Sequence, residues 1–527
     1  MFFEIKRHQL SIFVTVGLVV FGARLSHGQL AQAIRAQVTK EGGPIAAWYK
    51  ARSYVPVWSG ERLGGLAEFI QGLDAHGLSP ELFQFRKWDQ YWRNPDQSPA
   101  TRASIDVGTT HLALFAIQAL AYGFVDPASV HPKWKELKRQ VSAYDFLNSA
   151  LKEAPPRLGQ FLLTKVPPPD ERYREMVNTL ARYRKIASYG GWRVLASTPQ
   201  AVGPGSTYQQ IGLLRSRLQA EGDLPPSSGK FRGKTIDRQM GEAIKSFQFR
   251  HGIEPDGYIG AGTLKELNAP VSGRVNSLII NIDRLRWMPR AYEQADHIEV
   301  NIAESALRVF DNRRRITTMP VIVGVKGKHQ TPVFHGEVRF VIFRPYWNVP
   351  INIARSELVP KALSTPGYME ENRYEIVGGT KIVPNTAENL NKVSSGALRI
   401  RQVTGQGNAL GLVKFIFPND SSVYLHDTPD HSLFEHADRD FSHGCVRVAR
   451  PDELAEIVLR RNGGWRIDDV RAAMHDEAHP DHKVDLKSSM PVYLVYWTST
   501  IMGDGRVRFD QDIYGHDAIM FQKFGIH

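Results

Sequence analysis

The hydrophobic pattern of this chain changes its period near residue 275, and that change limits the folds open to it. Before this point apolar residues recur every three or four positions, as in amphipathic helices. After it they alternate over runs such as 297–310, as in strands. A length of 527 residues is also more than one hydrophobic core normally serves. We therefore predict an α+β protein of several domains, with helical parts first and a mostly β part, a sandwich or barrel, after them.

The N-terminal segment, positions 1–28, has the layout of an export signal. A basic pair, Lys6–Arg7, precedes an apolar run from Leu10 to Ala23, and small residues follow up to Gly28. The run is shorter than the roughly 20 residues that span a bilayer comfortably. We expect this segment to be a cleaved signal peptide or, alternatively, an uncleaved N-terminal membrane anchor, and the rest of the chain to be exported.

The chain is basic, with 66 Lys and Arg residues against 54 Asp and Glu residues and a formal net charge of +12. Export argues against nucleic acid as the partner that this charge would otherwise suggest. The basic residues are spread along the sequence, apart from the triplet Arg313–Arg315. This triplet is predicted to be a solvated surface, with attraction to an anionic envelope polymer or membrane as the functional alternative.

Residues 29–200 are predicted to form a helical scaffold domain. The apolar segment His111–Tyr122 is typical of a helix that ends at Gly123. Proline runs such as Pro167–Pro169 interrupt the region, so its helices should be short. Ala196–Thr207 is rich in Ser, Pro, Gly and Thr and poor in apolar residues, and we interpret it as a linker.

Residues 208–270 carry a characteristic order of motifs. Two helical faces are followed by His-Gly, Asp-Gly-Tyr-Ile-Gly and Thr-Leu-x-x-Leu-Asn, which begin at His251, Asp256 and Thr263. The glycines permit tight left-handed turns between helices, and Thr263 lies at a predicted helix start. This order resembles the small three-helix peptidoglycan-binding domain. The resemblance implies binding to the cell wall, with a role as a packing spacer as the alternative.

The chain has one cysteine, Cys445, so it cannot form an internal disulfide. This cysteine lies in Phe441–Val448, with the sequence Phe-Ser-His-Gly-Cys-Val-Arg-Val, and His426 lies a short distance upstream. A thiolate needs a nearby base or positive charge at neutral pH. Most lone cysteines are small core residues, but Gly, His and Arg are poor neighbours for an inert core position. We therefore interpret Cys445 as a catalytic thiol.

The strand-rich region, residues 275–475, is predicted to be the catalytic domain, with the thiol at the end of a strand. Within it, residues 354–398 have weak strand character and several glycines and prolines, so we interpret them as an insertion that forms a lid. Residues 490–527 contain a predicted strand, Val492–Trp497, and carry no obvious chemistry. We expect this C-terminal segment to pack on the core.

The motifs together resemble the L,D-transpeptidases that cross-link peptidoglycan, in particular the large periplasmic members with a peptidoglycan-binding module. The signature is a histidine, a spacer of limited length, and then Ser/Thr-His-Gly-Cys, and it fits His426 and Ser442–Cys445. Three further motifs fit the same family: Trp347–Pro350, Asn408–Gly411 and Tyr424–Pro429. The resemblance implies 3–3 cross-linking of stem peptides through a cysteine thioester, with release of D-alanine, in the periplasm.

The resemblance also implies residue roles. Cys445 corresponds to the nucleophile and His426 to the base, whose ring we expect a backbone carbonyl to hold, because Asp427 should point to the opposite face of its strand. The backbone N–H groups of Gly444 and Cys445 are predicted oxyanion donors. His443 is either a second proton carrier or oxyanion contributor or, as we favour, a loop residue whose ring does not meet the thiol.

The substrate groove is predicted from the same family. Arg447 should hold a substrate carboxylate or the loop itself. Ser442, Tyr424 and the pair Trp347–Asn348 match positions that line the groove, although a core role is a close alternative for the two aromatic residues. No cofactor is implied.

No metal site is predicted, because the histidines near the thiol show no closed ligand spacing with Cys445 (His426, His431, His436 and His443).

Two other functions stay open on sequence grounds. A cysteine peptidase would form the same thioester and pass it to water, while a non-catalytic wall-binding protein would keep only the fold. The intact Cys445–His426 pair disfavours the second. The expected partners are donor and acceptor stem tetrapeptides, with a membrane tether and other wall-synthesis proteins as further candidates, and the resemblance implies that carbapenems acylate the thiol.

Overall fold

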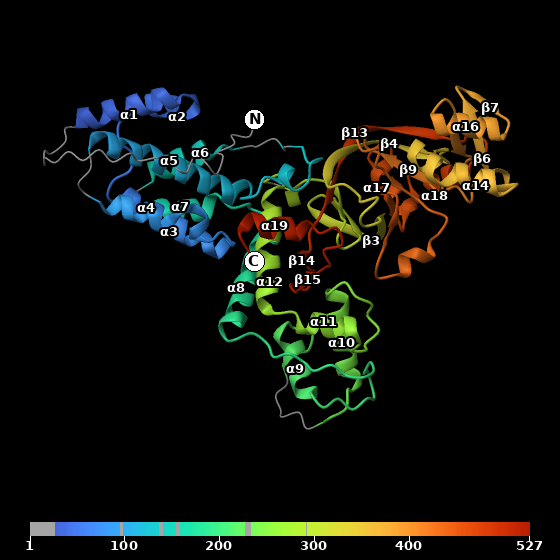
Figure 1. The fold of residues 1–527 in the computed structure, drawn as a ribbon, viewed down its shortest axis with the longest axis horizontal. Coiled ribbons are helices and arrows are strands. Elements are labelled where there is room, and N and C mark those ends of the chain that lie inside the picture. The colour runs from blue at the N-terminus through green and yellow to red at the C-terminus, as the bar shows by residue number, and fades with distance from the viewer. Residues whose placement is uncertain are drawn as a thin grey trace. The chain divides into compact units, whose positions relative to one another are not determined.

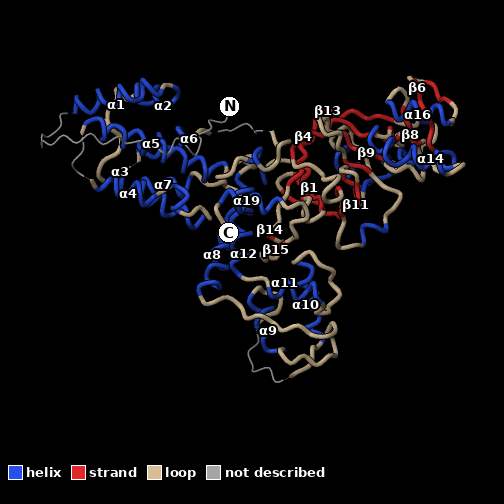
Figure 2. The backbone as a smooth tube through the Cα atoms, in the orientation of Figure 1, coloured by secondary structure: helices blue, strands red, loops and turns tan. Residues whose placement is uncertain are grey.

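A computed structural model describes residues 27–94, 98–135, 137, 141–153, 157–226, 233–290 and 292–526. The predicted signal or anchor lies outside these residues, apart from its last two positions. Contacts divide the chain into two compact units. The first comprises the described parts of 27–125, 138–169 and 285–290, and the second comprises the rest. The named strands all lie in the second unit (Figure 2).

The first unit is helical and is built around α5 (Pro99–Tyr122). The Ser98 hydroxyl accepts a hydrogen bond from Thr101 N–H at 3.2 Å, which caps the helix start, and the helix ends at Gly123 as predicted. Among the described helices, α5 alone is long and apolar enough to cross a membrane by length and composition, and 72% of its most apolar window is buried within the protein. The other helices here are α1 (His27–Glu41), α2 (Gly43–Lys50), α3 (Glu61–Gly72), α4 (Phe85–Arg93), α6 (Ala143–Lys152) and α7 (Leu158–Lys165).

The second unit contains α8 (Glu171–Ser188) and a three-helix module, α9 (Ile211–Ala220), α10 (Arg238–Arg250) and α11 (Ala261–Asn268). The predicted linker 196–207 takes part in this module. Val202 forms an isolated antiparallel bridge with Ile259, and Thr207 forms one with Thr235. The linker prediction was therefore wrong for these residues, because backbone pairing needs no apolar sequence signal. The helix α12 (Val271–Arg286) follows.

The strand-rich part forms a closed barrel. The described strands run in the order β11-β3-β12-β10-β9-β4-β13-β1-β2, and β2 also pairs with β3, which closes the sheet. Figure 1 labels β3, β4, β9 and β13 of this sheet. The pairs β1–β13 and β10–β12 are parallel, and the other pairs that close the ring are antiparallel. The strands are β1 (His297–Asn301), β2 (Ala306–Asp311), β3 (Arg314–Gly324), β4 (Phe334–Phe343), β9 (Val413–Ile416), β10 (Leu425–His426), β11 (Asp440–Ser442), β12 (Val446–Val448) and β13 (His482–Val495). Helices α17 (Pro451–Arg460) and α18 (Ile467–His475) follow β12 in the chain.

The C-terminal segment is more than a packing element. β13 lies between β4 and β1, so residues 490–495 are part of the barrel sheet and the predicted domain end at 475 comes too early. After β13 come the two-stranded β14 (Ser499–Ile501) and β15 (Val507–Phe509), and then α19 (His516–Phe524). Sequence alternation predicted a strand at Val492–Trp497, of which residues 492–495 lie in β13 and the last two residues do not. It could not assign the partners of this strand, because both lie far upstream in the sequence.

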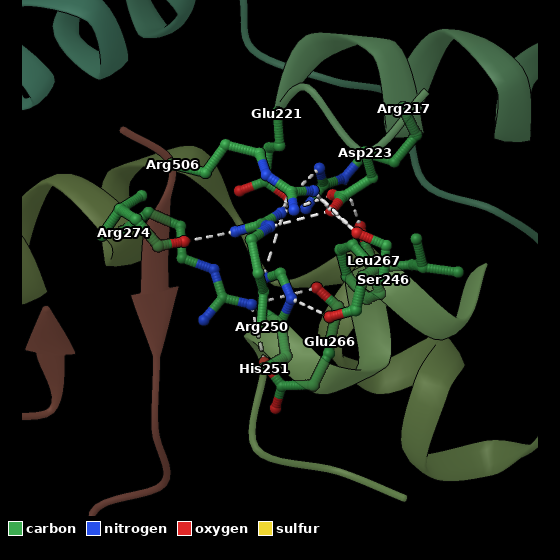
Figure 3. A network of polar contacts seen from close by, with 12 residues as sticks. Arg217, Glu221, Asp223, Ser246, Arg250, His251, Glu266, Leu267, Arg274 and Arg506 are labelled. Carbon is green, nitrogen blue, oxygen red and sulfur yellow. Dashed lines mark hydrogen bonds and ion pairs between the residues drawn. The ribbon is translucent and has the colours of Figure 1, made fainter. Parts of the chain in front are cut away.

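A buried ionic network joins the three-helix module to β15 and its flanking turn (Figure 3). Asp223 accepts hydrogen bonds from Arg250 Nε and from Arg506 Nη1, both at 2.9 Å, and Arg250 Nη1 donates to the carbonyl of Val507 at 2.6 Å. Glu221 accepts a hydrogen bond from Arg217 of the same module. Burial raises the pKa of Glu221, but the charges of Arg217 and Arg250 outweigh this and hold it well below its usual range.

The predicted insertion folds as a subdomain with its own core. A four-stranded sheet, β5-β8-β6-β7, combines β5 (Trp347–Asn348), β6 (Tyr374–Gly378), β7 (Lys381–Val383) and β8 (Arg399–Gln402). With it pack α13 (Ile351–Ile353), the π-helical turn η6 (Ala354–Leu358), α14 (Val359–Ser364), α15 (Tyr368–Glu371) and α16 (Ala387–Ser395). The insertion is therefore wider than the predicted 354–398, and we call residues 347–402 the lid subdomain.

Candidate active site

Two parallel strands bring the sequence-predicted site residues onto one face. Leu425 pairs with Val446 and His426 pairs with Arg447. Since paired residues share a face and side chains alternate along a strand, Tyr424, His426, Cys445 and Arg447 share one face. The opposite face holds Leu425 and Val446, which are both fully buried in the core. Cys445 immediately precedes β12.

The Cys445 thiol is positioned to be neutral at rest and stabilised once ionised. Its Sγ lies 3.8 Å from the carbonyl oxygen of Ser422. Burial raises the pKa of the thiol, while hydrogen bonds from the backbone and hydroxyl of Tyr424 and the charge of Arg447 lower it by less. The net shift is upward, so the thiol keeps its proton at neutral pH. A nucleophilic role for Cys445 therefore requires a base that removes this proton before or during attack.

His426 has the protonation state and tautomer that a base needs. Its Nδ1 lies 2.5 Å from the carbonyl oxygen of Asp427, which can only accept, so Nδ1 carries the proton and Nε2 keeps its lone pair. Burial, followed by the charge of Arg447, lowers the pKa of His426 to about 3. The ring is therefore neutral throughout the physiological range.

The carboxylate of Asp427 hydrogen-bonds to backbone groups near β10 and not to the imidazole of His426. Its two carboxylate oxygens accept from the backbone N–H groups of Leu412 at 2.8 Å and Thr428 at 2.7 Å. A Cβ at Gly411 would lie 2.3 Å from this carboxylate, so only glycine fits there. These contacts explain why the motif Asn408–Gly411 ends in glycine, since Gly411 lies in the turn that packs against β10.

Ser442 and Gly444 build the turn that presents the thiol. The Ser442 hydroxyl donates to the carbonyl of Cys445 at 2.5 Å and accepts from Gly444 N–H at 3.1 Å. Gly444 has φ of +110°, a conformation that favours glycine. The oxyanion role of Gly444 N–H stays a prediction, since in this structure Gly444 N–H donates to the Ser442 hydroxyl. Within the described residues Cys445 N–H has no backbone acceptor.

Two supporting residues escaped the sequence analysis. Thr331 donates from its hydroxyl to the carbonyl of Gly444 at 2.9 Å and accepts from Gly324 N–H at 2.9 Å. Tyr514 donates to the carbonyl of Gly324 at 2.5 Å and accepts from Thr331 N–H at 3.2 Å. The C-terminal segment thus holds the turn behind the thiol. No local motif marks either residue, since both act through partners far away in the sequence.

His443 faces the lid subdomain. Its Nε2 lies 2.8 Å from Glu357 Oε1 on η6. Trp347 and Asn348 lie in β5 of the lid sheet, where Trp347 is half-buried and packs on the lid core, and its ring centroid is 6.3 Å from that of Tyr374. The structure therefore brings Tyr424, Ser442, Gly444 and Arg447 to the thiol, and assigns Trp347 and Asn348 to the lid.

Three family models match this chain. Residues 295–485 match the YkuD family, the L,D-transpeptidase catalytic domain. Residues 43–180 match a "Scaffold domain", and residues 207–267 match a "Putative peptidoglycan binding domain". Residues 295–485 are thus similar to the L,D-transpeptidase catalytic domain and residues 207–267 to a peptidoglycan-binding domain, on a chain of the α+β class.

The relatives point the same way. A protein of Haemophilus influenzae described as "Putative L,D-transpeptidase" is 34% identical over 251 residues, which are 47% of this chain and 49% of that protein. The chain thus spans about half the length of the curated relative it matches.

Among solved structures, an L,D-transpeptidase from Stackebrandtia nassauensis has a TM-score of 0.21 at 14% identity, covering 57% of this chain and 96% of that chain. One from Xylanimonas cellulosilytica has a TM-score of 0.19 at 13% identity, covering 57% and 100%.

Proposed function

We propose that this protein is a peptidoglycan L,D-transpeptidase that forms 3–3 cross-links between stem peptides through a thioester on Cys445. One observation carries the proposal: a buried neutral imidazole, a protonated thiol, a tyrosine hydroxyl and a guanidinium share one face of two parallel strands. This set supplies a nucleophile, a base and stabilisation for the charge that passes between them.

The first half-reaction acylates the thiol. His426 Nε2 takes the proton from Cys445 Sγ as the sulfur attacks the carbonyl carbon between the third residue of a donor stem and its terminal D-alanine. Cys445 N–H donates to the developing oxyanion, a contact worth about 3–4 kcal/mol in transition-state stabilisation. The tetrahedral intermediate collapses, the C–N bond breaks, and D-alanine leaves with the proton from Nε2. A thioester remains.

The second half-reaction transfers the acyl group. The side-chain amine of the third residue of an acceptor stem attacks the thioester and gives its proton to His426 Nε2. The C–S bond then breaks, and Nε2 returns a proton to the sulfur. The charge of Arg447, which faces both Cys445 and His426, favours the thiolate and disfavours an imidazolium. This arrangement favours prompt passage of the proton to the leaving group.

Transfer, rather than hydrolysis, is supported by the lid. Glu357 of the lid subdomain contacts His443, two residues before the thiol. A lid at this position limits access of water to the thioester. The peptidoglycan-related domains also support a location at the cell wall or in the periplasm, where stem peptides occur.

Purified disaccharide tetrapeptide tests the proposal. The wild-type protein should convert it to a cross-linked dimer and free D-alanine, both identified by mass spectrometry. In a separate incubation with a carbapenem, the intact protein should gain the mass of the carbapenem. The Cys445→Ala variant should give neither and should keep the wild-type melting temperature. If the product were disaccharide tripeptide without any dimer, the protein would be a hydrolase. If neither a product nor an acyl-enzyme formed, the protein would be a non-catalytic wall-binding protein.

A further inference from the structure

Three side chains from distant segments converge beside the catalytic turn: His329 between β3 and β4, Glu357 on η6 of the lid subdomain, and His443. Their ligand atoms all lie within 4.8 Å of one another. His443 Nε2 is 2.8 Å from Glu357 Oε1, and the ring centroids of the two histidines are 4.8 Å apart. Sequence spacing could not reveal this set, because its members belong to three separate segments of the chain.

The backbone fixes two of these positions. A Cβ at Gly324 would lie 1.8 Å from the carbonyl oxygen of His329, so the loop carrying His329 is pressed against β3 where only glycine fits. Thr331, two residues further on, bonds the carbonyl of Gly444 at 2.9 Å and so holds this loop against the turn that carries His443. The backbone segments that carry the two histidines are therefore held against each other in the protein without a ligand.

The third position is on an uncommon type of element. Glu357 belongs to a five-residue π-helical turn, and π-turns inside helices often mark functional sites. Its side chain is 36% exposed and that of His443 is 41% exposed, so a solvated ion can reach both. Two imidazoles and one carboxylate are a zinc donor set, and three protein ligands leave the fourth tetrahedral position to water.

We propose that Zn²⁺ binds to His329, Glu357 and His443 and thereby ties the lid subdomain to the catalytic turn. Bound metal would bridge the His443–Glu357 contact and hold the lid closed beside the thiol. Zinc binding is independent of the catalytic chemistry, while its consequence, slower exchange of substrate and product at Cys445, rests on the proposed function.

The binding test uses the full-length chain with Cys445→Ser, which removes the thiol as a competing zinc ligand. Titration with ZnCl₂ by calorimetry should show one equivalent bound. Adding His329→Asn or Glu357→Gln should weaken binding at least tenfold. The matched control, His479→Asn, changes an exposed histidine paired with Asp476 and should leave the affinity unchanged.

A second measurement follows the lid itself. Zinc should slow amide hydrogen exchange across residues 351–364 in the Cys445→Ser protein and leave it unchanged when Glu357→Gln is added. Equal zinc affinity in all four proteins would overturn the site, and binding without slower exchange would overturn the tie to the lid. Melting temperatures without metal show whether each variant is folded. An absence of peptide cross-linking by the wild-type protein would contradict the proposed function and would not affect the conclusion on zinc binding.

Discussion

At the scale of single residues, the proposed mechanism starts from two titratable groups that are both neutral. The Cys445 thiol has a raised pKa and the His426 imidazole has a lowered one, of about 3, so no preformed thiolate–imidazolium pair exists at neutral pH. In the proposed mechanism the proton therefore passes from the thiol to the imidazole during attack. This separates the site from those in which an ion pair is the resting state.

The pH dependence of acylation distinguishes the two histidines. Because the pKa of His426 is about 3, its base form persists as pH falls, and the carbapenem acylation rate should show no acid limb near pH 6.5. His426→Ala should lower this rate by at least a hundredfold, and His443→Ser by far less, because His443 faces Glu357. Stopped-flow acylation from pH 5 to 9 measures both. A larger loss in His443→Ser would move the base assignment to His443.

The Tyr424 hydroxyl should set the pKa of the thiol. Its hydrogen bond lowers that pKa, so Tyr424→Phe should move the midpoint of iodoacetamide alkylation to higher pH, because the thiolate loses a hydrogen-bond donor. Tyr374→Phe, which removes a hydroxyl from the lid core, is the control and should not move the midpoint. An unchanged midpoint in Tyr424→Phe would remove the hydroxyl from the mechanism.

At the scale of elements, sequence motifs correctly predicted the features that depend only on residues close together in the sequence or on neighbouring strands. The spacing of His426 and Cys445 follows from two neighbouring parallel strands, and the end of α5 at Gly123 follows from a helix-breaking residue. Glu357, Thr331 and Tyr514 were not predictable, because their roles arise from contacts 86 to 190 positions away in the sequence. The pairing of β13 was missed for the same reason. Register between distant strands is a property of the closed barrel and leaves no trace in either strand alone.

The ionic network of Figure 3 should decide whether the three-helix module stays docked on β15. Asp223→Ala leaves Arg250 buried with one partner fewer and should cost about 3–5 kcal/mol. The expected result is faster amide exchange in α10 and β15, measured by mass spectrometry. Glu388→Ala, which breaks an exposed pair with Lys392, is the control and should leave exchange unchanged. Equal exchange in both variants would mean that apolar contacts alone hold the module.

At the scale of the second unit, α8 is held to the barrel by a buried carboxylate. Glu299 of β1 is fully buried and accepts from Arg172 of α8 at 2.9 Å and from Arg308 of β2 at 3.1 Å. Tyr292 donates its hydroxyl to the same carboxylate at 3.0 Å. Three segments therefore depend on one negative charge, which makes their association sensitive to acid.

The sign of that sensitivity follows from the pKa of Glu299. Burial raises it, but the charges of Arg172 and Arg308 outweigh burial and lower it to about 2, from 4.5 in the unfolded chain. A carboxylate with a depressed pKa stabilises the fold above its unfolded pKa and loses this effect as pH falls through its folded pKa. Glu299→Gln should therefore lower the free energy of unfolding by about 3 kcal/mol at pH 7, and by roughly half as much at pH 3. Denaturant unfolding of both proteins from pH 7 to 3, with Glu388→Gln as an exposed control, measures the difference. A difference that is constant over this range would show that packing, rather than charge, holds α8 to the barrel.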